Sequence, residues 1–210
     1  GKYQIPTSDK VNKSLDEDEI KSLWGAMPEN DLQAKAKDFW FFSYFTYGMN
    51  VKDICELKHS SVEGKNIFYV RAKTKNTKKK KVIKQVPVTK SIAEIIKRQK
   101  DKSSDYLFGI IDSKDSPKDV HEKIRNFNKF INKHFREFAK STGIDEKTAS
   151  KYGTYHARHS FATIAVRKGN SMELISEILH DGNIRTTQSY LNSFPKETFH
   201  ELSKELEIIL

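Results

Sequence analysis

The stretch Asn66-Ile67-Phe68-Tyr69-Val70 decides the fold class of this chain, because it is rich in β-branched and aromatic residues within a sequence otherwise patterned for helices. A second segment of this kind, Val82 to Val88, follows after a loop and predicts the return strand of a small antiparallel hairpin or meander. The sequence therefore predicts a mainly α fold with a small antiparallel β-sheet, in the α+β class.

Helices are predicted on both sides of this hairpin. Ser14 and Glu17 form a capping-box pattern that predicts a helix running to about Met27. An aromatic, apolar band then predicts a buried helix over Asp31 to Tyr47, ending at Gly48. The other predicted helices have apolar residues at helical spacing between Gly and Pro breaks, and they span Val51 to Leu57, Ser91 to Lys100, Val120 to Thr142, His156 to Lys168, Met172 to Leu179, Ile184 to Asn192 and Glu197 to Leu210.

The loop between the two predicted strands is dense in lysine and contains no acid. Its lysines are Lys73, Lys75, Lys78, Lys79, Lys80 and Lys81. Such a run repels itself and is commonly a solvated tip. The favoured interpretation is a basic hairpin tip that reaches nucleic-acid phosphates, since each neutralised phosphate releases condensed counterions. We therefore predict DNA contacts at Lys75, Lys78, Lys79, Lys80 and Lys81.

The bulk composition agrees with a polyanionic partner. The 210 residues suit one domain with a sizeable core, and 38 Lys and Arg against 28 Asp and Glu give a formal net charge of +10. A basic protein with a merely solvated lysine surface remains the alternative. The single cysteine, Cys55, excludes an internal disulfide and a cysteine-based zinc site, and we expect it to be a buried small hydrophobe.

The chain has no apparent targeting segment. No apolar run approaches the roughly 18 residues of a membrane span, and no secretory signal is visible. We therefore expect a cytoplasmic protein without a membrane partner, associated with the nucleoid when it is bound to DNA.

The carboxyl-terminal part carries an ordered set of reactive residue types. The set runs through Ala157-Arg158-His159-Ser160-Phe161-Ala162-Thr163, Leu179-His180 and Thr186-Thr187-Gln188-Ser189-Tyr190. Arginine is a permanently charged fork for phosphate oxygens, histidine can shuttle a proton near neutral pH, and a deprotonated tyrosine can form a covalent intermediate. Together these residues indicate a site that breaks and rejoins a nucleic-acid backbone.

From about Ser14 to its end, the chain resembles the catalytic domain of the tyrosine recombinases, the phage-integrase-like family. The resemblance implies a transesterification without metal or cofactor, in which Tyr190 attacks the scissile phosphate and leaves a 3′-phosphotyrosyl bond. It further implies that Arg158 clamps the phosphate and that His180 belongs to the site. Lys73 is then the general acid toward the leaving 5′-oxygen, although Lys75 or Lys78 could take that role.

Two positions depart from the family pattern. Asn50 stands where the family has its first arginine, and it can donate a hydrogen bond but supplies no charge. We hypothesise that Arg71 replaces this arginine, because it lies two residues before Lys73 and would share a face with it on an extended strand. Tyr155 stands where relatives often have histidine. Tyr155 is favoured for that place, and His156 in a shifted turn is the alternative.

The histidines next to these positions raise two further questions. His159 is expected to pack or hydrogen-bond beside the site. A metal site formed by His156, His159 and His180 is disfavoured, because the first two lack the spacing of a helical zinc pair and no carboxylates lie nearby.

The resemblance also implies the domain organisation and the partners. Residues 1–13 are expected to be a linker from a missing amino-terminal core-binding domain, and residues 14–210 the catalytic domain with a carboxyl-terminal helix that packs either in cis or on a neighbouring protomer. The expected partner is double-stranded DNA, bound by a homotetramer on two sites, with a monomer in the absence of DNA. A non-catalytic DNA-binding relative and a type IB topoisomerase-like enzyme are the alternative functions.

Overall fold

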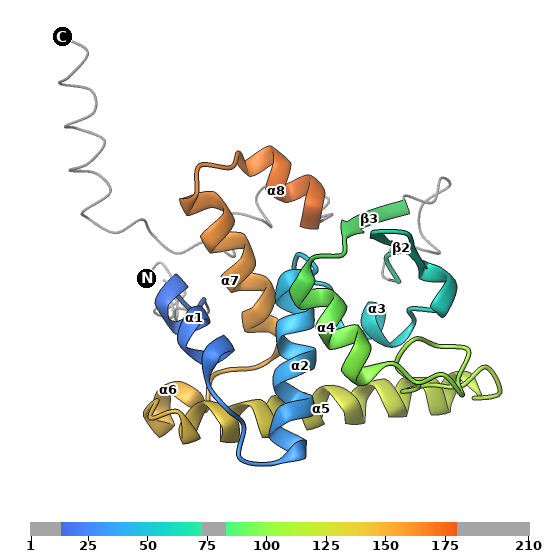
Figure 1. The fold of residues 1–210 in the computed structure, drawn as a ribbon, viewed down its shortest axis with the longest axis horizontal. Helices are drawn as coiled ribbons and strands as arrows, with labels where there is room; N and C mark the ends of the chain where they lie inside the picture. The colour runs from blue at the N-terminus through green and yellow to red at the C-terminus, as the bar shows by residue number, and fades with distance from the viewer. Residues whose placement is uncertain (1–13, 73–82, 180–210) are drawn as a thin grey trace, which may run out of the picture.

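The computed structural model describes residues 14–72 and 83–179, which form a mainly helical body with one small sheet (Figure 1). The α-helices described are α1 (Glu17–Gly25), α2 (Asp31–Phe45), α3 (Val51–Cys55), α4 (Lys90–Gln99), α5 (Pro117–Ser141), α6 (Glu146–Ala149), α7 (Thr154–Arg167) and α8 (Met172–Leu179). A 3-10 helix, His59–Ser61, precedes the strands β1 (Val62–Glu63), β2 (Asn66–Val70) and β3 (Ile83–Pro87). The predicted fold class is confirmed. The predicted helices Ile184 to Asn192 and Glu197 to Leu210 lie outside the described residues.

The first helix starts two residues later than the sequence predicts. Asp16 is its N-cap, with a side chain that accepts from the Glu19 N–H at 2.8 Å while the Glu19 carboxylate accepts from the Asp16 N–H. The predicted box of Ser14 with Glu17 is therefore wrong. The reason is tertiary, because the Leu15 N–H donates to Ser160 Oγ at 2.8 Å and holds this segment against α7.

The sheet is a three-stranded antiparallel meander in the order β1-β2-β3. The predicted pairing is confirmed, with Asn66 opposite Pro87 and Ile67 opposite Val86. Ile67 and Val86 are buried, so this cross-strand pair attaches the sheet to the core. The two-residue strand β1, like α6 and the 3-10 helix, was not predicted, since so short a segment carries no readable periodicity.

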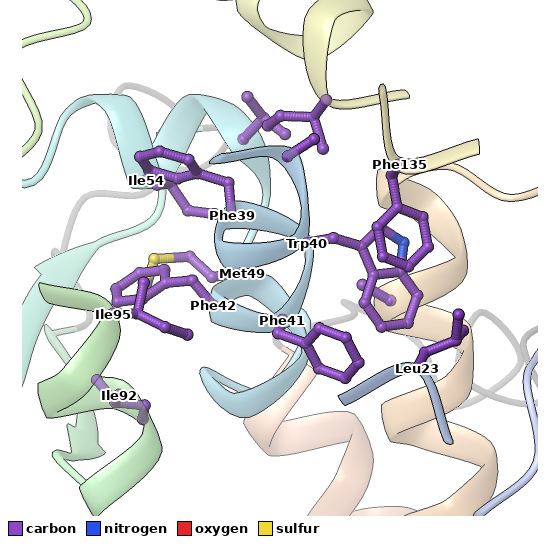
Figure 2. Close-up of a cluster of buried hydrophobic side chains, with 14 of the residues drawn as sticks. Leu23, Phe39, Trp40, Phe41, Phe42, Met49, Ile54, Ile92, Ile95 and Phe135 are labelled. Carbon is purple, nitrogen blue, oxygen red and sulfur yellow. The ribbon is translucent and has the colours of Figure 1, made fainter. Parts of the chain in front are cut away.

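Helix α2 is the centre of the core. Four consecutive aromatic residues, Phe39 to Phe42, are almost completely buried, so α2 is covered by other elements on every side. Figure 2 shows Trp40 stacked on Phe135 of α5, with the ring centroids 4.5 Å apart. The Trp40 indole also donates to the Gly153 carbonyl at 2.9 Å, directly before α7. The aromatic band thus fixes both α5 and the start of α7.

Helix α8 is joined to the body by a separate, smaller apolar cluster. Ile175 and Leu179 pack with Ala162 of α7, apart from the main core around α2. In Figure 1, α8 crosses beyond the end of α7 and its carboxyl-terminal end lies near β3. Partly buried apolar residues add to this cluster, and polar contacts at the end of α8 complete the attachment.

Candidate phosphate-binding site

Arg158 is the buried centre of the candidate site. It lies on α7 with an exposed fraction of 4%. Its Nη1 donates to the Gly48 carbonyl at 3.0 Å, and its Nη2 donates to the Leu179 carbonyl at 2.7 Å. The guanidinium therefore bridges the end of α2 and the end of α8.

Gly48 is required for this bridge. Its φ of +71° lies in the left-handed region that favours glycine. A Cβ added here would lie 2.7 Å from Arg158 Cγ and 2.8 Å from Arg158 Cα, closer than carbon atoms pack. Because no side chain intervenes, the turn after α2 can lie directly against α7 and present its carbonyl to the arginine.

Arg71 and Arg158 share one hydrogen-bond acceptor. The Arg71 Nη1 donates to the same Leu179 carbonyl at 3.0 Å, so two guanidinium groups converge on a single oxygen. The strand argument that suggested Arg71 is wrong in detail, because β2 ends at Val70 and Arg71 lies just beyond it. The reason is that the Ala72 N–H donates to the Asp53 carboxylate at 2.7 Å, which takes the chain out of the ladder.

Asp53 is the residue of this site that the sequence did not reveal. It lies on α3 and is only 5% exposed, next to both arginines. Burial raises the pKa of its carboxyl above the ordinary value, and the Ala72 N–H, the Arg71 charge, a hydrogen bond from the Asn50 side chain and the Arg158 charge offset this only in part. The only signal in the sequence was an acid between Val51 and Ile54, two residues predicted to be apolar positions of one short helix.

The charges of these groups do not cancel. Arg71 and Arg158 carry two positive charges, whereas Asp53 supplies at most one negative charge. Asn50 lies at the N-cap of α3 and contributes a hydrogen bond to Asp53 but no charge. The described part of the site thus keeps an excess of positive charge, which suits it to bind an anion.

Tyr155 and His156 lie in the first turn of α7 on different faces. Residues three apart are neighbours on a helix surface, so Tyr155 shares a face with Arg158. The Tyr155 side chain is half-exposed, and its ring meets His159 edge-on at 4.5 Å. His156 instead lies near Tyr152, with ring centroids 5.9 Å apart. Tyr155 and His156 therefore have different surroundings, and the buried His159 packs against Tyr155.

The remaining predicted site residues cannot be placed. Lys73, Lys75, Lys78, Lys79, Lys80, Lys81, His180 and Tyr190 lie outside the described residues. Within residues 14–72 and 83–179, no three His, Cys, Asp or Glu side chains are grouped so that they could hold a metal ion. No helix in these two ranges is both long and apolar enough to cross a bilayer.

The fold is that of the catalytic domains of tyrosine recombinases, and in it two arginines converge on one carbonyl oxygen. The sequence matches the phage integrase family over residues 13–197, and the chain belongs to this family. It is 28% identical over 178 residues to tyrosine recombinase XerA of Pyrococcus furiosus, covering 85% of this chain and 56% of that protein. A tyrosine recombinase of Thermosipho africanus is 26% identical over 197 residues, covering 93% of this chain and 62% of that protein.

Solved structures agree with this assignment. A crystal structure of XerA recombinase superposes with a TM-score of 0.59 at 25% identity, covering 91% of this chain and 62% of that one. The Tn1549 transposon integrase in complex with transposon right end DNA gives a TM-score of 0.64 at 13% identity, covering 98% of this chain and 69% of that one, which shows the shared fold. The chain spans less than two thirds of the length of the two sequence relatives.

Proposed function

We propose that this chain is the catalytic domain of a site-specific DNA recombinase, an integrase of a mobile element. The observation that carries the proposal is the convergence of Arg71 and Arg158 on one oxygen beside the buried Asp53. Membership of the phage integrase family supports it, and the fold shared with a transposon integrase agrees with a mobile-element origin.

The proposed reaction exchanges one phosphodiester for another. The Tyr190 oxygen forms a bond to the scissile phosphorus while the bond to the 5′-oxygen breaks, leaving a 3′-phosphotyrosyl link. Lys73 donates a proton to the departing 5′-oxygen, and His180 is the proposed shuttle for the proton that Tyr190 loses. The 5′-hydroxyl of a second strand then attacks the phosphotyrosyl link and releases Tyr190, so no external energy source is consumed.

The arginine pair would stabilise the crowded, more negative phosphorus centre of the transition state. Preorganised donors aimed at developing charge are among the largest contributions to such catalysis. Arg71 thereby takes the place that Asn50 leaves without charge. Tyr155, which shares the Arg158 face of α7, is proposed as a further donor to a phosphate oxygen.

The proposed partner is double-stranded DNA, with a homotetramer on two sites and a monomer in its absence. The lysines from Lys73 to Lys81 would add phosphate contacts, which makes affinity fall steeply with salt. Residues 1–13 are proposed to link this domain to a core-binding domain. We further propose that the protein acts in the cytoplasm, on DNA of the nucleoid.

A covalent-trapping experiment tests the chemistry. A pool of nicked duplexes with randomised sequence is incubated with the 210-residue chain, and adducts are resolved on a denaturing gel. The parent should form an adduct that Tyr190→Phe does not form. DNA binding without an adduct would instead identify a non-catalytic relative, and relaxation of supercoiled plasmid without strand exchange would identify a topoisomerase-like enzyme.

The role of Arg71 is tested on the sequences that this pool enriches. Arg71→Ala should lower the single-turnover cleavage rate by about 100-fold, as expected for loss of one transition-state donor. Arg125→Ala, which removes an exposed arginine on α5, is the matched control for lost charge. Equal cleavage by these two variants would refute the hypothesis that Arg71 replaces the arginine that is missing at position 50.

A further inference from the structure

We infer that Lys84 is a positioning residue, which ties the carboxyl-terminal end of α8 to the β2–β3 hairpin and so sets the separation between the two halves of the proposed cleavage site. This inference rests on the proposed function. Lys84 lies on β3, and its Nζ donates to the Glu177 carbonyl at 2.5 Å and to the Ile178 carbonyl at 2.9 Å. Neither its sequence position nor its residue type marked it among the many lysines of the chain.

The last described carbonyls of α8 accept hydrogen bonds from cations of other elements. The last carbonyls of a helix have no intrahelical donor, and cations near that end are favourable because of the helix dipole. The last turn of α8 contains no basic residue of its own. Lys84, which lies on the sheet, therefore supplies the cation that the last turn of α8 lacks.

The contact belongs to a set of three cations on three consecutive carbonyls. Lys84 donates to Glu177 and Ile178, while Arg71 and Arg158 both donate to Leu179. These cations come from β3, from the segment after β2 and from α7. The end of α8 is thus a further point, besides the buried pair Ile67 and Val86, at which the sheet is attached to the helical body.

The Lys84 contacts add to the apolar packing at this junction. An open pocket of about 290 Å³ lies between parts of β3 and α8, and Tyr47, Lys84, Leu174 and Ile178 are among its lining residues. The Lys84 side chain extends from β3, and its charged Nζ reaches the carbonyls of α8. Without it, the hydrogen bonds that join the end of α8 to β3 are lost, which favours local opening of this end.

The connection to chemistry follows from the order of the chain. His180 directly follows Leu179, and Lys73 directly follows Ala72, the residue after Arg71. Lys73 and His180, the two proposed proton-transfer groups, therefore directly follow segments that are held together at the end of α8. Because a misplacement of about 1 Å can lower a rate by about 100-fold, loosening this end should slow cleavage without loss of any group that touches DNA.

The experiment compares Lys84→Met with Lys65→Met, which removes an exposed lysine from the turn before β2. Single-turnover cleavage of an enriched nicked duplex should fall by about 10- to 100-fold in Lys84→Met, while its DNA dissociation constant changes by less than about threefold. Lys84→Arg should restore cleavage, since a guanidinium also donates to carbonyls. Deuterium uptake of the amides from Ile175 to Leu179 should accelerate in Lys84→Met and not in α2 or α5.

The outcomes separate this inference from the proposed function. If the parent forms no adduct, the proposed function fails, and deuterium uptake alone decides whether Lys84 fastens α8. Equal cleavage by Lys84→Met and Lys65→Met would overturn the positioning role. A loss of cleavage that saturating DNA fully restores would also overturn it, because Lys84 would then be a phosphate contact. If Lys84→Met does not fold, Lys84→Gln, which keeps a donor, takes its place in both measurements.

Discussion

Replacing Gly48 by alanine should destabilise the protein and displace Arg158 in one step. The left-handed φ of +71° costs a non-glycine residue about 1–2 kcal/mol. The new Cβ would also lie 2.7–2.8 Å from three carbon atoms of Arg158, one of them backbone, so relief requires α7 or the turn to move. Overpacking of this kind costs about 1–3 kcal/mol, giving about 2–5 kcal/mol in total.

Gly64→Ala is the matched control for this prediction. Gly64 has a φ of +56°, but a Cβ added there meets no atom within 4 Å. Its substitution should cost only the backbone strain of about 1–2 kcal/mol. The difference between the two variants therefore isolates the clash with Arg158.

Urea unfolding followed by tryptophan fluorescence measures both variants, since the buried Trp40 reports on the core. We expect Gly48→Ala to lose at least about 1 kcal/mol more than Gly64→Ala and to cleave DNA more slowly even where it is fully folded. If the two variants lost equal stability and Gly48→Ala cleaved like the parent, the close approach of Gly48 to Arg158 would not be what holds the arginine.

Three further predictions concern an ion pair, a buried thiol and a buried tyrosine. Arg98→Met should cost about 1–3 kcal/mol in urea unfolding, because Arg98 Nε and Nη2 donate to the buried Asp38 carboxylate at 3.0 and 2.6 Å; a cost no larger than that of Arg125→Met would contradict this. Burial raises the pKa of the Cys55 thiol to about 12, so a thiol reagent at pH 8 should label it about 100-fold faster in denaturant than in buffer, and equal rates would show that it is accessible. Burial, with the nearby Asp53, raises the pKa of Tyr69 to about 12. The neutral Tyr69 side chain should therefore stabilise the fold fully below the unfolded pKa of about 10, and this stabilisation should be lost as the pH rises to 12. In alkaline unfolding curves, Tyr69→Phe should flatten that decline in stability.

Local patterns predicted those elements whose signal lies within a single segment. The β-branched run at Asn66–Val70 predicted both bounds of β2, and the apolar spacing from Met172 predicted the start of α8. The start of α1 could not be predicted, because Ser14 and Asp16 are each followed three residues later by glutamate. The bond from the Leu15 N–H to Ser160 decides between them, and it joins residues 145 positions apart.

The residues of the candidate site also differ in whether a local sequence pattern reveals them. Arg158 was recognisable from its ordered motif, whereas Asp53 was not, because one acid in a short helix normally faces solvent. Its burial depends on the Ala72 N–H and on arginines contributed by distant segments. The convergence of Arg71 on Leu179 likewise joins residues 108 positions apart, and no periodicity reports such a contact.

The partners of the arginines explain how the site can be buried and still attract phosphate. The hydrogen bonds that Arg158 donates to Gly48 and Leu179, and that Arg71 donates to Leu179, end on neutral carbonyl oxygens. Neutral acceptors take these hydrogen bonds without cancelling the charge of the arginines, whereas a carboxylate at each guanidinium would compete with a phosphate. Asp53 is a carboxylate near both guanidinium groups, and burial raises the pKa of its carboxyl above the ordinary value. An acid at Asn50 would remove this advantage, so Asn50→Asp should weaken DNA binding more than Asn50→Ala, although both variants lose the amide.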